Sequence, residues 1–418
     1  MYEVDEDREP TGPLGLADEP PTWDPSNDQK AVYDGIREWY RTAPTGTTTL
    51  GGLGGTGKSF LLGKLAYDLL KEGVSVKFAA PTGRAALVAQ ASLRKSGVYN
   101  AEVTTIHRLI YRPDSDPETG RIRGWIKRFS IEADLIVLDE ASMVSQEMVA
   151  DLEAFGVPIL AIGDHGQLPP VGEEAGLLAN PDFRLEKIHR QAKGNPIIRL
   201  CTWARNGAKQ KDFLRLIKKL DDDRLVVGSA EEAIAWGKPP GMVISYTNRT
   251  RSDLNMEMRE QLYGYDDMVD PQVGEAVICL KNHKIGWDED SMIIANGMRG
   301  EIKAAHESRR QHNLCFDIEF DEPVGVVRYL NCCTHQFLHP KTFAGFTDVP
   351  GDHKSFFTVG ALMDFGYAAT CHKAQGSQFD SVAVVLERAL DFMSNEEYAR
   401  WTYTAFSRAS ERLMIVKA

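Results

Sequence analysis

The sequence Gly52-Leu53-Gly54-Gly55-Thr56-Gly57-Lys58-Ser59 decides the fold class, because it matches the phosphate-binding pattern GxxxxGK[ST] in full. It follows the apolar run Thr47–Leu50 and precedes a leucine-rich helical pattern. Glycines let consecutive backbone N–H groups point inward around phosphates, and the start of the next helix adds partial positive charge. The residues expected to wrap the phosphates of a nucleotide are Gly54, Gly55, Thr56, Gly57 and Lys58.

A second motif, Leu135-Ile136-Val137-Leu138-Asp139-Glu140, places two carboxylates directly after four apolar residues. A strand this apolar is buried, and ligands of open α/β sheets bind at the carboxyl ends of the strands. We therefore expect Asp139 to hold Mg²⁺ together with the Ser59 hydroxyl. Glu140 is expected to be the general base that orients the attacking water, and Lys58 to neutralise the β- and γ-phosphate oxygens.

Short apolar runs alternate with helical patterns along much of the chain. The runs Val74–Ala80 and Ile159–Ile162 extend the pattern around the first motif. A second such pattern starts near Met242–Tyr246 and resumes at Ser381–Leu386 and Arg412–Val416. This alternation predicts an α/β fold with two domains, each built on a parallel sheet covered by helices on both faces.

Two segments interrupt the alternation. Tyr111–Lys127 consists of two short runs around a turn-rich centre, which predicts a hairpin insertion. Residues 268–350 are β-rich without helical periodicity, which predicts a small β-barrel inserted into the second domain. The predicted domains are a disordered acidic tail (1–22), a first domain (23–110 and 129–182), the hairpin (111–128), a second domain (183–267 and 351–418) and the inserted barrel (268–350).

The composition argues against several classes of protein. The chain has 418 residues and a net charge of −12, from 48 Lys and Arg against 60 Asp and Glu. No apolar run approaches the about 20 residues of a membrane span, and the N-terminus lacks a signal-peptide layout, so we expect neither membrane insertion nor Sec-type export. The six cysteines lack CxxC spacing and the ten histidines lack HExxH, which predicts reduced thiols and no zinc site. The acidic tail is expected either to contact a protein partner or to keep the chain soluble.

Further motifs occur in a fixed order after the phosphate-binding loop. They are Ala80-Pro81-Thr82-Gly83-Arg84, Thr105-Ile106-His107, the box Gly163–Val171, His189-Arg190, the box His372–Gln378 and Tyr403–Arg408. With this set the chain resembles the superfamily 1 DNA helicases of the 5′→3′ class, the RecD/Dda-like group, from about residue 24 to the C-terminus. The resemblance implies two RecA-like domains with ATP in the cleft between them.

The resemblance also implies roles for residues at that cleft. Gln167 would sense the γ-phosphate, Arg190 and Arg408 would act as arginine fingers, and Gln375 and Gly376 would line the cleft. The implied activity is ATP-dependent translocation 5′→3′ on single-stranded DNA with unwinding of duplex DNA. The alternative is a translocase stimulated by single-stranded DNA that remodels protein–DNA complexes with little unwinding.

The residues that the resemblance places against single-stranded DNA have plainer alternatives. They are Pro81, Thr82, Thr105, His107, Thr370, His372 and Lys373. Thr82 and Thr105 could instead only cap helices, and His107 could be a packed core histidine. Tyr246, Phe337 and Phe346 are candidates for stacking bases, or else ordinary buried aromatics. Gln29 is expected to pair with adenine, or else to be a solvent-facing helical glutamine.

The resemblance assigns the hairpin to a pin that separates the strands at a fork; the alternative is a plain surface hairpin. The expected ligands are ATP and Mg²⁺, and the expected partners are single-stranded DNA and the duplex fork. We expect a monomer in the cytoplasm of a bacterium or a phage-infected host. Replication, recombination and repair all remain open as the setting.

Overall fold

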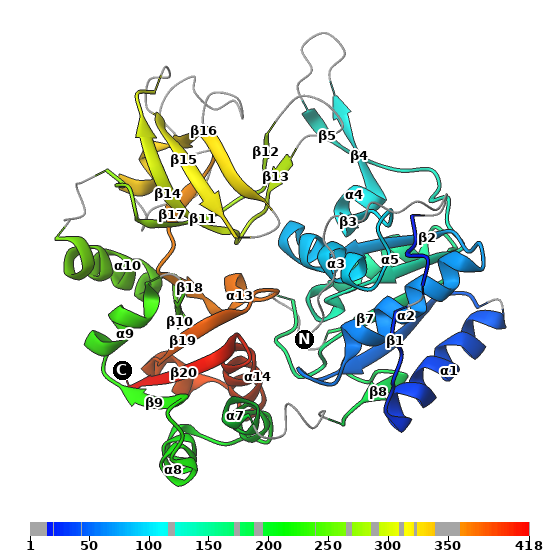
Figure 1. Cartoon of the computed structure of the whole chain (residues 1–418), viewed down its shortest axis with the longest axis horizontal. Coiled ribbons are helices and arrows are strands. Elements are labelled where there is room, and N and C mark those ends of the chain that lie inside the picture. Colours follow the sequence, from blue (N-terminus) through cyan, green and yellow to red (C-terminus); the bar gives the residue numbers. More distant parts are fainter. Residues whose placement is uncertain are drawn as a thin grey trace. The chain divides into compact units, whose positions relative to one another are not determined.

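The computed structural model describes residues 15–19, 21–42, 44–115, 122–170, 176–187, 195–238, 240–264, 270–285, 292–308, 313–321, 324–338 and 360–417 (Figure 1). The chain divides into two compact units, Met1–Lys193 and Gly194–Ala418. Among the described residues, no helix has the length and apolar character needed to cross a membrane.

The first unit is built on a parallel sheet of six strands in the order β3-β2-β6-β7-β1-β8. Its strands are β1 (Thr47–Gly52), β2 (Val76–Ala80), β3 (Val103–Thr105), β6 (Leu135–Leu138), β7 (Ile159–Gly163) and β8 (Phe183–Leu185). Its helices are α1 (Asn27–Arg41), α2 (Lys58–Lys71), α3 (Gly83–Lys95), α4 (Ile106–Ile110), the 3₁₀ turn η1 (Ala141–Met143) and α5 (Gln146–Glu153). The predicted parallel sheet is confirmed.

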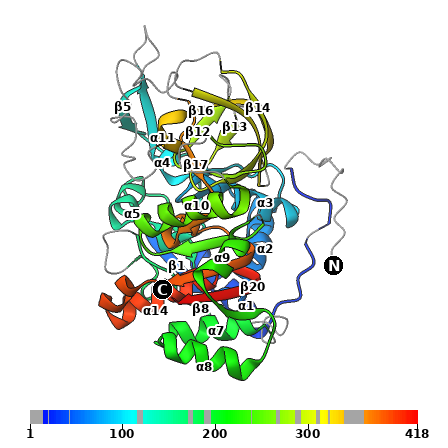
Figure 2. The same cartoon turned by 90° about the vertical axis from the view of Figure 1, so that its left-hand side faces the viewer.

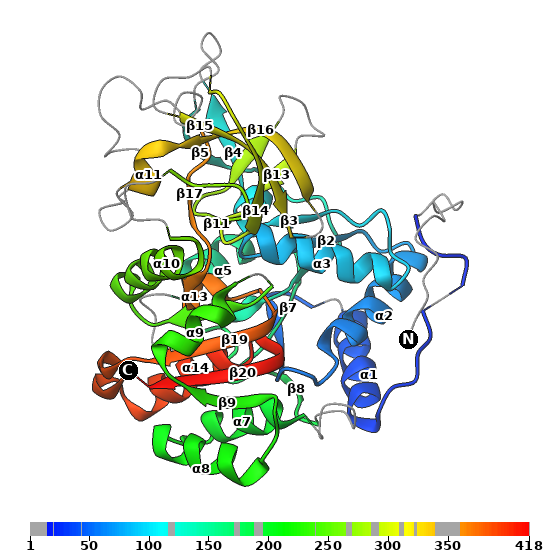
Figure 3. The same cartoon turned by 60° about the vertical axis from the view of Figure 1, so that its left-hand side comes forward.

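Both faces of this sheet are buried, which explains why its strands read as unbroken apolar runs. Leu135 and Val137 of β6 pack into one core with residues of α1, α2 and α3. Ile136 and Leu138 pack into a second core with residues of α4 and α5. α1 and α2 lie side by side on the first of these faces (Figure 3).

Two expectations about the first unit were wrong. Residues 15–17 are packed rather than disordered, because Leu16 is buried in the first core and forms a β-bridge with Val98. The backbone N–H of Ala17 also donates to the Gly97 carbonyl at 2.8 Å. The first domain extends past residue 182, because β8 pairs with β1. Residues 1–14 and 20 of the predicted tail lie outside the described residues.

A hairpin leaves the first unit directly after α4. β4 (Tyr111–Ser115) pairs antiparallel with β5 (Ile122–Lys127), from Tyr111 opposite Lys127 to Ser115 opposite Ile122. The tip of the hairpin lies outside the described residues.

The second unit contains a parallel sheet of five strands in the order β18-β10-β19-β20-β9. Its strands are β9 (Leu225–Gly228), β10 (Met242–Ser245), β18 (Ala368–Thr370), β19 (Phe379–Leu386) and β20 (Ala409–Lys417). Its helices are α7 (Pro196–Arg205), α8 (Gln210–Leu220), α9 (Ala230–Gly237), α10 (Asn248–Tyr263), α13 (Cys371–Ala374), the 3₁₀ turn η2 (Arg388–Phe392) and α14 (Asn395–Phe406). α9 and α10 lie on one face of the sheet, and α7 and α14 on the other (Figures 1 and 2).

An antiparallel sheet is inserted into the second unit, in the order β16-β15-β14-β11-β17. Its strands are β11 (Ala276–Cys279), β14 (Arg299–His306), β15 (Asn313–Phe320), β16 (Gly325–Cys333) and β17 (Met363–Phe365), beside the small hairpin β12 (His283–Ile285) and β13 (Met292–Ile294) and the helix α11 (Thr334–Leu338). The insertion was predicted to end at residue 350. That boundary was wrong, because β17 pairs with β11. An isolated parallel bridge also joins Cys332, at the end of β16, to Ala361.

Buried arginines attach this antiparallel sheet to the α/β part of the second unit. Arg251 and Arg259 of α10 pair with Asp364 and Glu275 at 2.7 Å each, with all four side chains almost fully buried. Arg299 of β14 donates to backbone carbonyls at the end of α9 and the start of β10. Buried charges are tolerated when they are paired in this way.

Candidate active site

The phosphate-binding loop connects β1 to α2 and is folded tightly on itself. Gly55 and Gly57 have φ values of 78° and 85°, in the left-handed region that glycine adopts at little cost. A Cβ on Gly52 would lie 2.8 Å from the Thr56 hydroxyl, so the close turn requires glycine there. Thr56 is fully buried, and its hydroxyl donates to the Leu53 carbonyl at 2.8 Å. The loop therefore has a fixed shape, with Gly54 and Gly55 exposed at its rim.

The Lys58 ammonium group lies against the inside of this loop. It donates to the carbonyls of Gly52 at 2.6 Å and Leu53 at 3.1 Å. Ser59 is exposed at the first turn of α2, next to it. A cation placed over a glycine loop at a helix start is a site for phosphate oxygens.

The acidic motif lies at the carboxyl end of β6, as predicted from its position after an apolar strand. The Asp139 backbone N–H donates to the Ala79 carbonyl, and its carboxylate accepts from the Glu140 N–H at 2.9 Å. Burial raises the pKa of Asp139, while the Glu140 N–H and the positive charge of Lys58 oppose that rise. Because its charge acts on Asp139, Lys58 couples the phosphate-binding loop electrostatically to the acidic motif. Glu140 has a φ of 52°, a left-handed conformation that is uncommon outside glycine.

Gln167 follows β7, which is the next strand of the sheet after β6. Its side chain is 8% exposed, and its amide oxygen is buried without a hydrogen-bond partner in the described part of the chain. Asp164 organises the same turn by accepting from the Gly166 N–H at 2.9 Å. A buried amide oxygen without a partner costs free energy, which a ligand at this position would recover.

The Gln29 side chain is buried, and both ends of its amide form hydrogen bonds. It is 2% exposed; its amide nitrogen donates to the Thr56 carbonyl at 3.1 Å and its oxygen accepts from the Ser26 N–H at 3.0 Å. The solvent-facing alternative is therefore wrong, and pairing with adenine remains a prediction. The contact with Thr56 joins α1 to the phosphate-binding loop.

The residues of the first unit that were predicted to contact single-stranded DNA lie at the carboxyl ends of β2 and β3. Thr82 caps α3 by accepting from Ala85 N–H at 3.2 Å, and Thr105 caps α4 by accepting from Arg108 N–H at 3.3 Å. Capping uses an oxygen lone pair, so each hydroxyl hydrogen can still donate. His107 is half-buried against the Tyr111 ring, at 4.8 Å between ring centroids, rather than in the core. Pro81 is half-buried beside Thr82.

In the second unit, Thr370, His372 and Lys373 lie where β18 runs into α13. Burial lowers the pKa of His372. Burial also lowers the pKa of Lys373. The positive charge of Arg251 lowers this pKa further, and the negative charge of Asp364 opposes the decrease. Lys373 therefore lies beside the buried Arg251–Asp364 pair.

Arg408 is held inside the second unit. It is 5% exposed, and its guanidinium donates to the carbonyls of Thr404 at 3.1 Å and Ser377 at 3.0 Å and to the Ser407 hydroxyl. Gln375 is 6% exposed in the same segment, and Gly376 has a φ of 71°. The second predicted finger, Arg190, lies outside the described residues, as does Phe346.

Phe337 is a core residue, not a base-stacking one. It is 2% exposed and packs on Phe365, with ring centroids 5.3 Å apart. Tyr246 is half-buried, with its ring edge-on to Trp401, and remains a candidate for stacking.

Two family models match the chain. Residues 27–229 match an AAA domain, and residues 365–416 match a UvrD-like helicase C-terminal domain. The ATP-dependent RecD2 DNA helicase of Deinococcus radiodurans is 26% identical over 374 residues, which cover 86% of this chain and 45% of that protein. The RecBCD enzyme subunit RecD of Mycolicibacterium smegmatis is 26% identical over 412 residues, which cover 89% of this chain and 68% of that protein.

Over most of its length the chain is therefore similar to superfamily 1 helicases of the RecD type.

Solved structures of Pif1 helicases share the fold. Bacteroides Pif1 bound to single-stranded DNA superposes with a TM-score of 0.54, at 18% identity, over 95% of this chain and 93% of that one. Pif1 helicase from Candida albicans gives a TM-score of 0.52 at 17% identity, over 94% of each chain. The chain spans less than half the length of the Deinococcus RecD2 helicase.

The residues of this site fit a magnesium nucleotide. The Lys58 ammonium and the unpartnered Gln167 oxygen offer a phosphate-neutralising donor and a water-binding acceptor at neighbouring strand ends. Asp139 and Ser59 are one carboxylate and one hydroxyl, which suits Mg²⁺ because this ion keeps phosphate oxygens and waters as its other ligands.

Sequence reasoning missed two features of the second unit. The first is that Arg251 and Asp364, 113 positions apart, form the charged neighbourhood of Lys373. The second is Glu387, whose carboxylate accepts from the N–H groups of Tyr246 and Thr247 at the start of α10. Local sequence carries no signal for either, since each depends on strands that meet only in the fold.

Proposed function

We propose that this chain is an ATP-dependent DNA helicase that translocates 5′→3′ on single-stranded DNA and unwinds duplex DNA. The observation that carries the proposal is that Lys58, Asp139 and Gln167 follow β1, β6 and β7, adjacent parallel strands of one sheet. The similarity to the RecD2 DNA helicase supports the helicase activity, and the direction of movement rests on the resemblance.

The first unit supplies the chemistry of hydrolysis. Lys58 neutralises the β- and γ-phosphate oxygens, Glu140 takes the proton of the attacking water, and Gln167 orients that water. Asp139 and Ser59 would hold Mg²⁺, which when bound neutralises charge on the phosphates. The fixed loop and the half-buried Asp139, whose carboxylate accepts from the Glu140 N–H, support these roles, because preorganised groups lose little free energy to reorganisation.

The contacts with single-stranded DNA are proposed at the strand ends described above. Thr82, Thr105 and His107 offer hydroxyl and imidazole groups in the first unit, and Thr370, His372 and Lys373 offer a hydroxyl, an imidazole and an ammonium group in the second. Such groups fix a phosphate backbone without reading its sequence. We also propose that Arg408 and Arg190 act on the phosphates during hydrolysis, which requires Arg408 to leave its present hydrogen bonds.

The two insertions are proposed to act at the fork. The β4–β5 hairpin would be the pin that separates the strands. The antiparallel sheet would be a small closed barrel, which is supported by hydrogen bonds of Ala361 with Asn331 and Cys333 of β16. Ala361 lies two residues before β17, so these bonds bring the two edges of the sheet together.

A strand-displacement assay with 5′-tailed and 3′-tailed duplexes tests the proposal. We expect ATP-dependent unwinding of the 5′-tailed duplex only, and no unwinding by Lys58→Ala. Hydrolysis that single-stranded DNA stimulates, without displacement of either duplex, would favour the remodelling translocase instead. A wild-type ATPase rate that single-stranded DNA does not change would refute both.

A further inference from the structure

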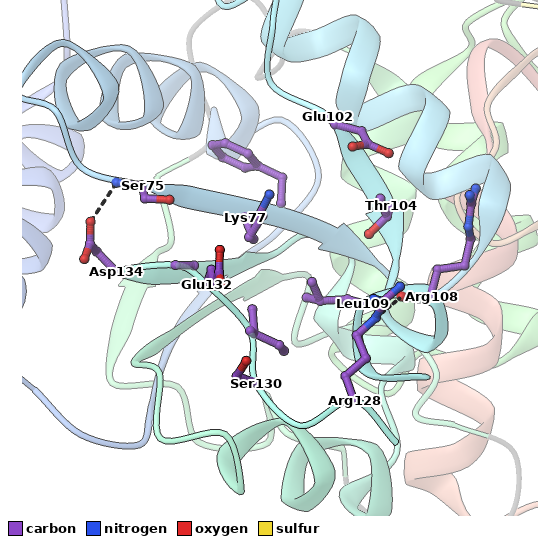
Figure 4. A pocket seen from close by; sticks show the side chains of 13 residues that line it. Ser75, Lys77, Glu102, Thr104, Arg108, Leu109, Arg128, Ser130, Glu132 and Asp134 are labelled. Atoms are coloured by element: carbon purple, nitrogen blue, oxygen red, sulfur yellow. Dashed lines mark hydrogen bonds between the residues drawn. The ribbon is translucent and has the colours of Figure 1, made fainter. Parts of the chain in front are cut away.

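A polar pocket of about 890 Å³ lies in the first unit beside the edge strand β3 (Figure 4). Its floor comes from β2 and β3 through Lys77 and Thr104, and its walls come from α4 and from residues 128–134. Lys77 and Ala79 are two positions apart on β2, so their side chains lie on the same face of the sheet. Ala79 packs into the core under α4 and α5, so the pocket opens on that face. α4 has only five residues and leaves this part of the face uncovered.

Two arginines at one end of the pocket mark the base of the β4–β5 hairpin. Arg108 precedes β4 by three residues, and Arg128 directly follows β5. They are held together, because the Arg128 N–H donates to the Ile110 carbonyl at 2.8 Å and its guanidinium to the Arg108 carbonyl at 3.4 Å. Both side chains and Lys77 are exposed, and none of the three forms an ion pair with another described residue.

Carboxylates line other parts of the pocket. Asp134 accepts from the Ser75 N–H at 2.8 Å, and this pair lies at the end opposite Arg128 (Figure 4). Glu132 lies toward the same end, and Glu102 lies above the floor, beside Thr104. The charge is therefore divided along the pocket, and an anionic ligand is favoured only at the arginine end.

The arginine end also offers a hydrogen-bond donor, and an exposed aromatic ring that does not line the pocket follows Arg128 in the sequence. The Thr104 hydroxyl oxygen is buried and has no hydrogen-bond partner among the described residues. Phe129 follows Arg128 and is 94% exposed. Exposed aromatic rings next to arginines are what proteins use to bind single strands without sequence preference. A free anion would use the cations but not the ring.

We propose that this pocket holds the displaced strand of a DNA fork, with two phosphates at Arg108 and Arg128 and one base on Phe129. The inference rests on the proposed function. Pro81 and Thr82, proposed for the tracking strand, follow the carboxyl end of β2, whereas Lys77 lies about 13 Å earlier along the same strand, at about 3.3 Å per residue. Thr105 and His107, also proposed for the tracking strand, adjoin Thr104 and Arg108 of the pocket, so the two strands would part there, at the base of the hairpin.

The test compares a fork that has 5′ and 3′ tails with the same duplex that has only the 5′ tail. For the wild type, the 3′ tail should tighten binding, with a contribution that falls about sevenfold between 50 and 200 mM salt if two single-strand phosphates are neutralised. Arg108→Ala/Arg128→Ala should lose this contribution. The matched control is Arg94→Ala/Lys95→Ala, which removes the same charge from exposed positions at the end of α3 and should keep it.

Two further variants test the arrangement within the pocket. Glu102→Gln/Glu132→Gln should strengthen fork binding, because it removes negative charge from the pocket that would hold the phosphates. Phe129→Ala should weaken it at all salt concentrations, because stacking is not electrostatic.

The proposal is overturned if the 3′ tail adds nothing to wild-type affinity, or if the double arginine variant keeps the contribution of the tail. It is also overturned if that variant loses the ATPase stimulation by single-stranded DNA, because the arginines would then serve the tracking strand. The proposed function fails on a different measurement, an unstimulated ATPase in the wild type.

Discussion

The side-chain amide of Gln29 donates to the backbone carbonyl of Thr56 at 3.1 Å, which joins the first helix to the centre of the phosphate-binding loop. The amide oxygen accepts from Ser26, so the same side chain also fixes the start of α1. A residue predicted to read adenine is thus also a support for the loop that would bind the phosphates.

Replacing Gln29 should therefore affect nucleotides of every base. In Gln29→Glu a carboxylate oxygen faces the Thr56 carbonyl, and a buried mismatch of this kind costs about 1–3 kcal/mol. We expect KM for ATP to rise about tenfold or more, with KM for GTP rising equally if the residue only supports the loop. Lys30→Ala, at an exposed position on the same helix, is the control. A rise for ATP alone would assign Gln29 to adenine recognition.

Lys58→Ala should abolish hydrolysis while leaving the protein folded. Among the described residues, the hydrogen bonds of the Lys58 ammonium go to two loop carbonyls, so its loss removes charge stabilisation rather than core packing. We expect kcat to fall by at least about a hundredfold, as for the loss of one preorganised donor. ATPase rates at saturating single-stranded DNA measure this, with Lys71→Ala at the other end of α2 as the control. Retained hydrolysis would remove Lys58 from the site.

Glu140→Gln should separate binding from turnover. The amide keeps the shape of the side chain but cannot accept the proton of water, so ATP should bind with near-normal affinity and kcat should fall by about 10²–10⁴-fold. Glu140→Gly tests the left-handed backbone at this position, and should lose turnover equally without loss of thermal stability. Normal turnover in Glu140→Gln would exclude it as the base.

The parts of the fold that could be predicted are those specified locally. The run Leu135–Leu138 is apolar at every position because both faces of β6 are buried, and it was read correctly as a strand. β8 and β17 have three residues each, too few to show a period. Each is a strand only because it pairs with β1 or β11, more than 80 positions away in sequence.

The same division applies to the site. The loop and the acidic motif could be expected near each other, because carboxyl ends of parallel strands share one edge. The buried oxygen of Gln167 and the double contact of Gln29 depend on how the loops fold back, which the motifs do not encode. The packing of Leu16 was missed because the segment around it is acidic and contains prolines, which made the whole segment look disordered. Leu16 is nevertheless buried in the core.

Lys373 predicts opposite pH dependences for DNA affinity and stability. Burial lowers its pKa from 10.5 in the folded protein, so between that lowered value and 10.5 the unfolded chain binds more protons and stability should rise with pH. Over the same range the folded side chain loses the charge that would bind phosphate, so affinity for single-stranded DNA should fall. Lys373→Arg keeps its charge and should flatten the affinity profile measured by fluorescence anisotropy. Parallel profiles for the two proteins would exclude a contact between Lys373 and DNA.

The buried pair of Arg259 and Glu275 should be the most sensitive point in the second unit. Two hydrogen bonds of 2.7 and 3.0 Å join the groups, and Glu275 also accepts from the Tyr367 hydroxyl and the Gln272 N–H. Removing one partner leaves an uncompensated buried charge, so Glu275→Ala should cost about 3–5 kcal/mol in denaturant unfolding.

Loss of the arginine as well should recover part of that cost, because no charge then stays unpaired. We therefore expect Arg259→Met/Glu275→Leu to be more stable than Glu275→Ala alone. The exposed pair Lys30–Asp34 provides the comparison, and Asp34→Ala should leave the denaturation midpoint unchanged. If the double variant instead loses the summed cost of both single changes, the two residues do not act as a pair. In that case the link between α10 and the antiparallel sheet depends on other contacts.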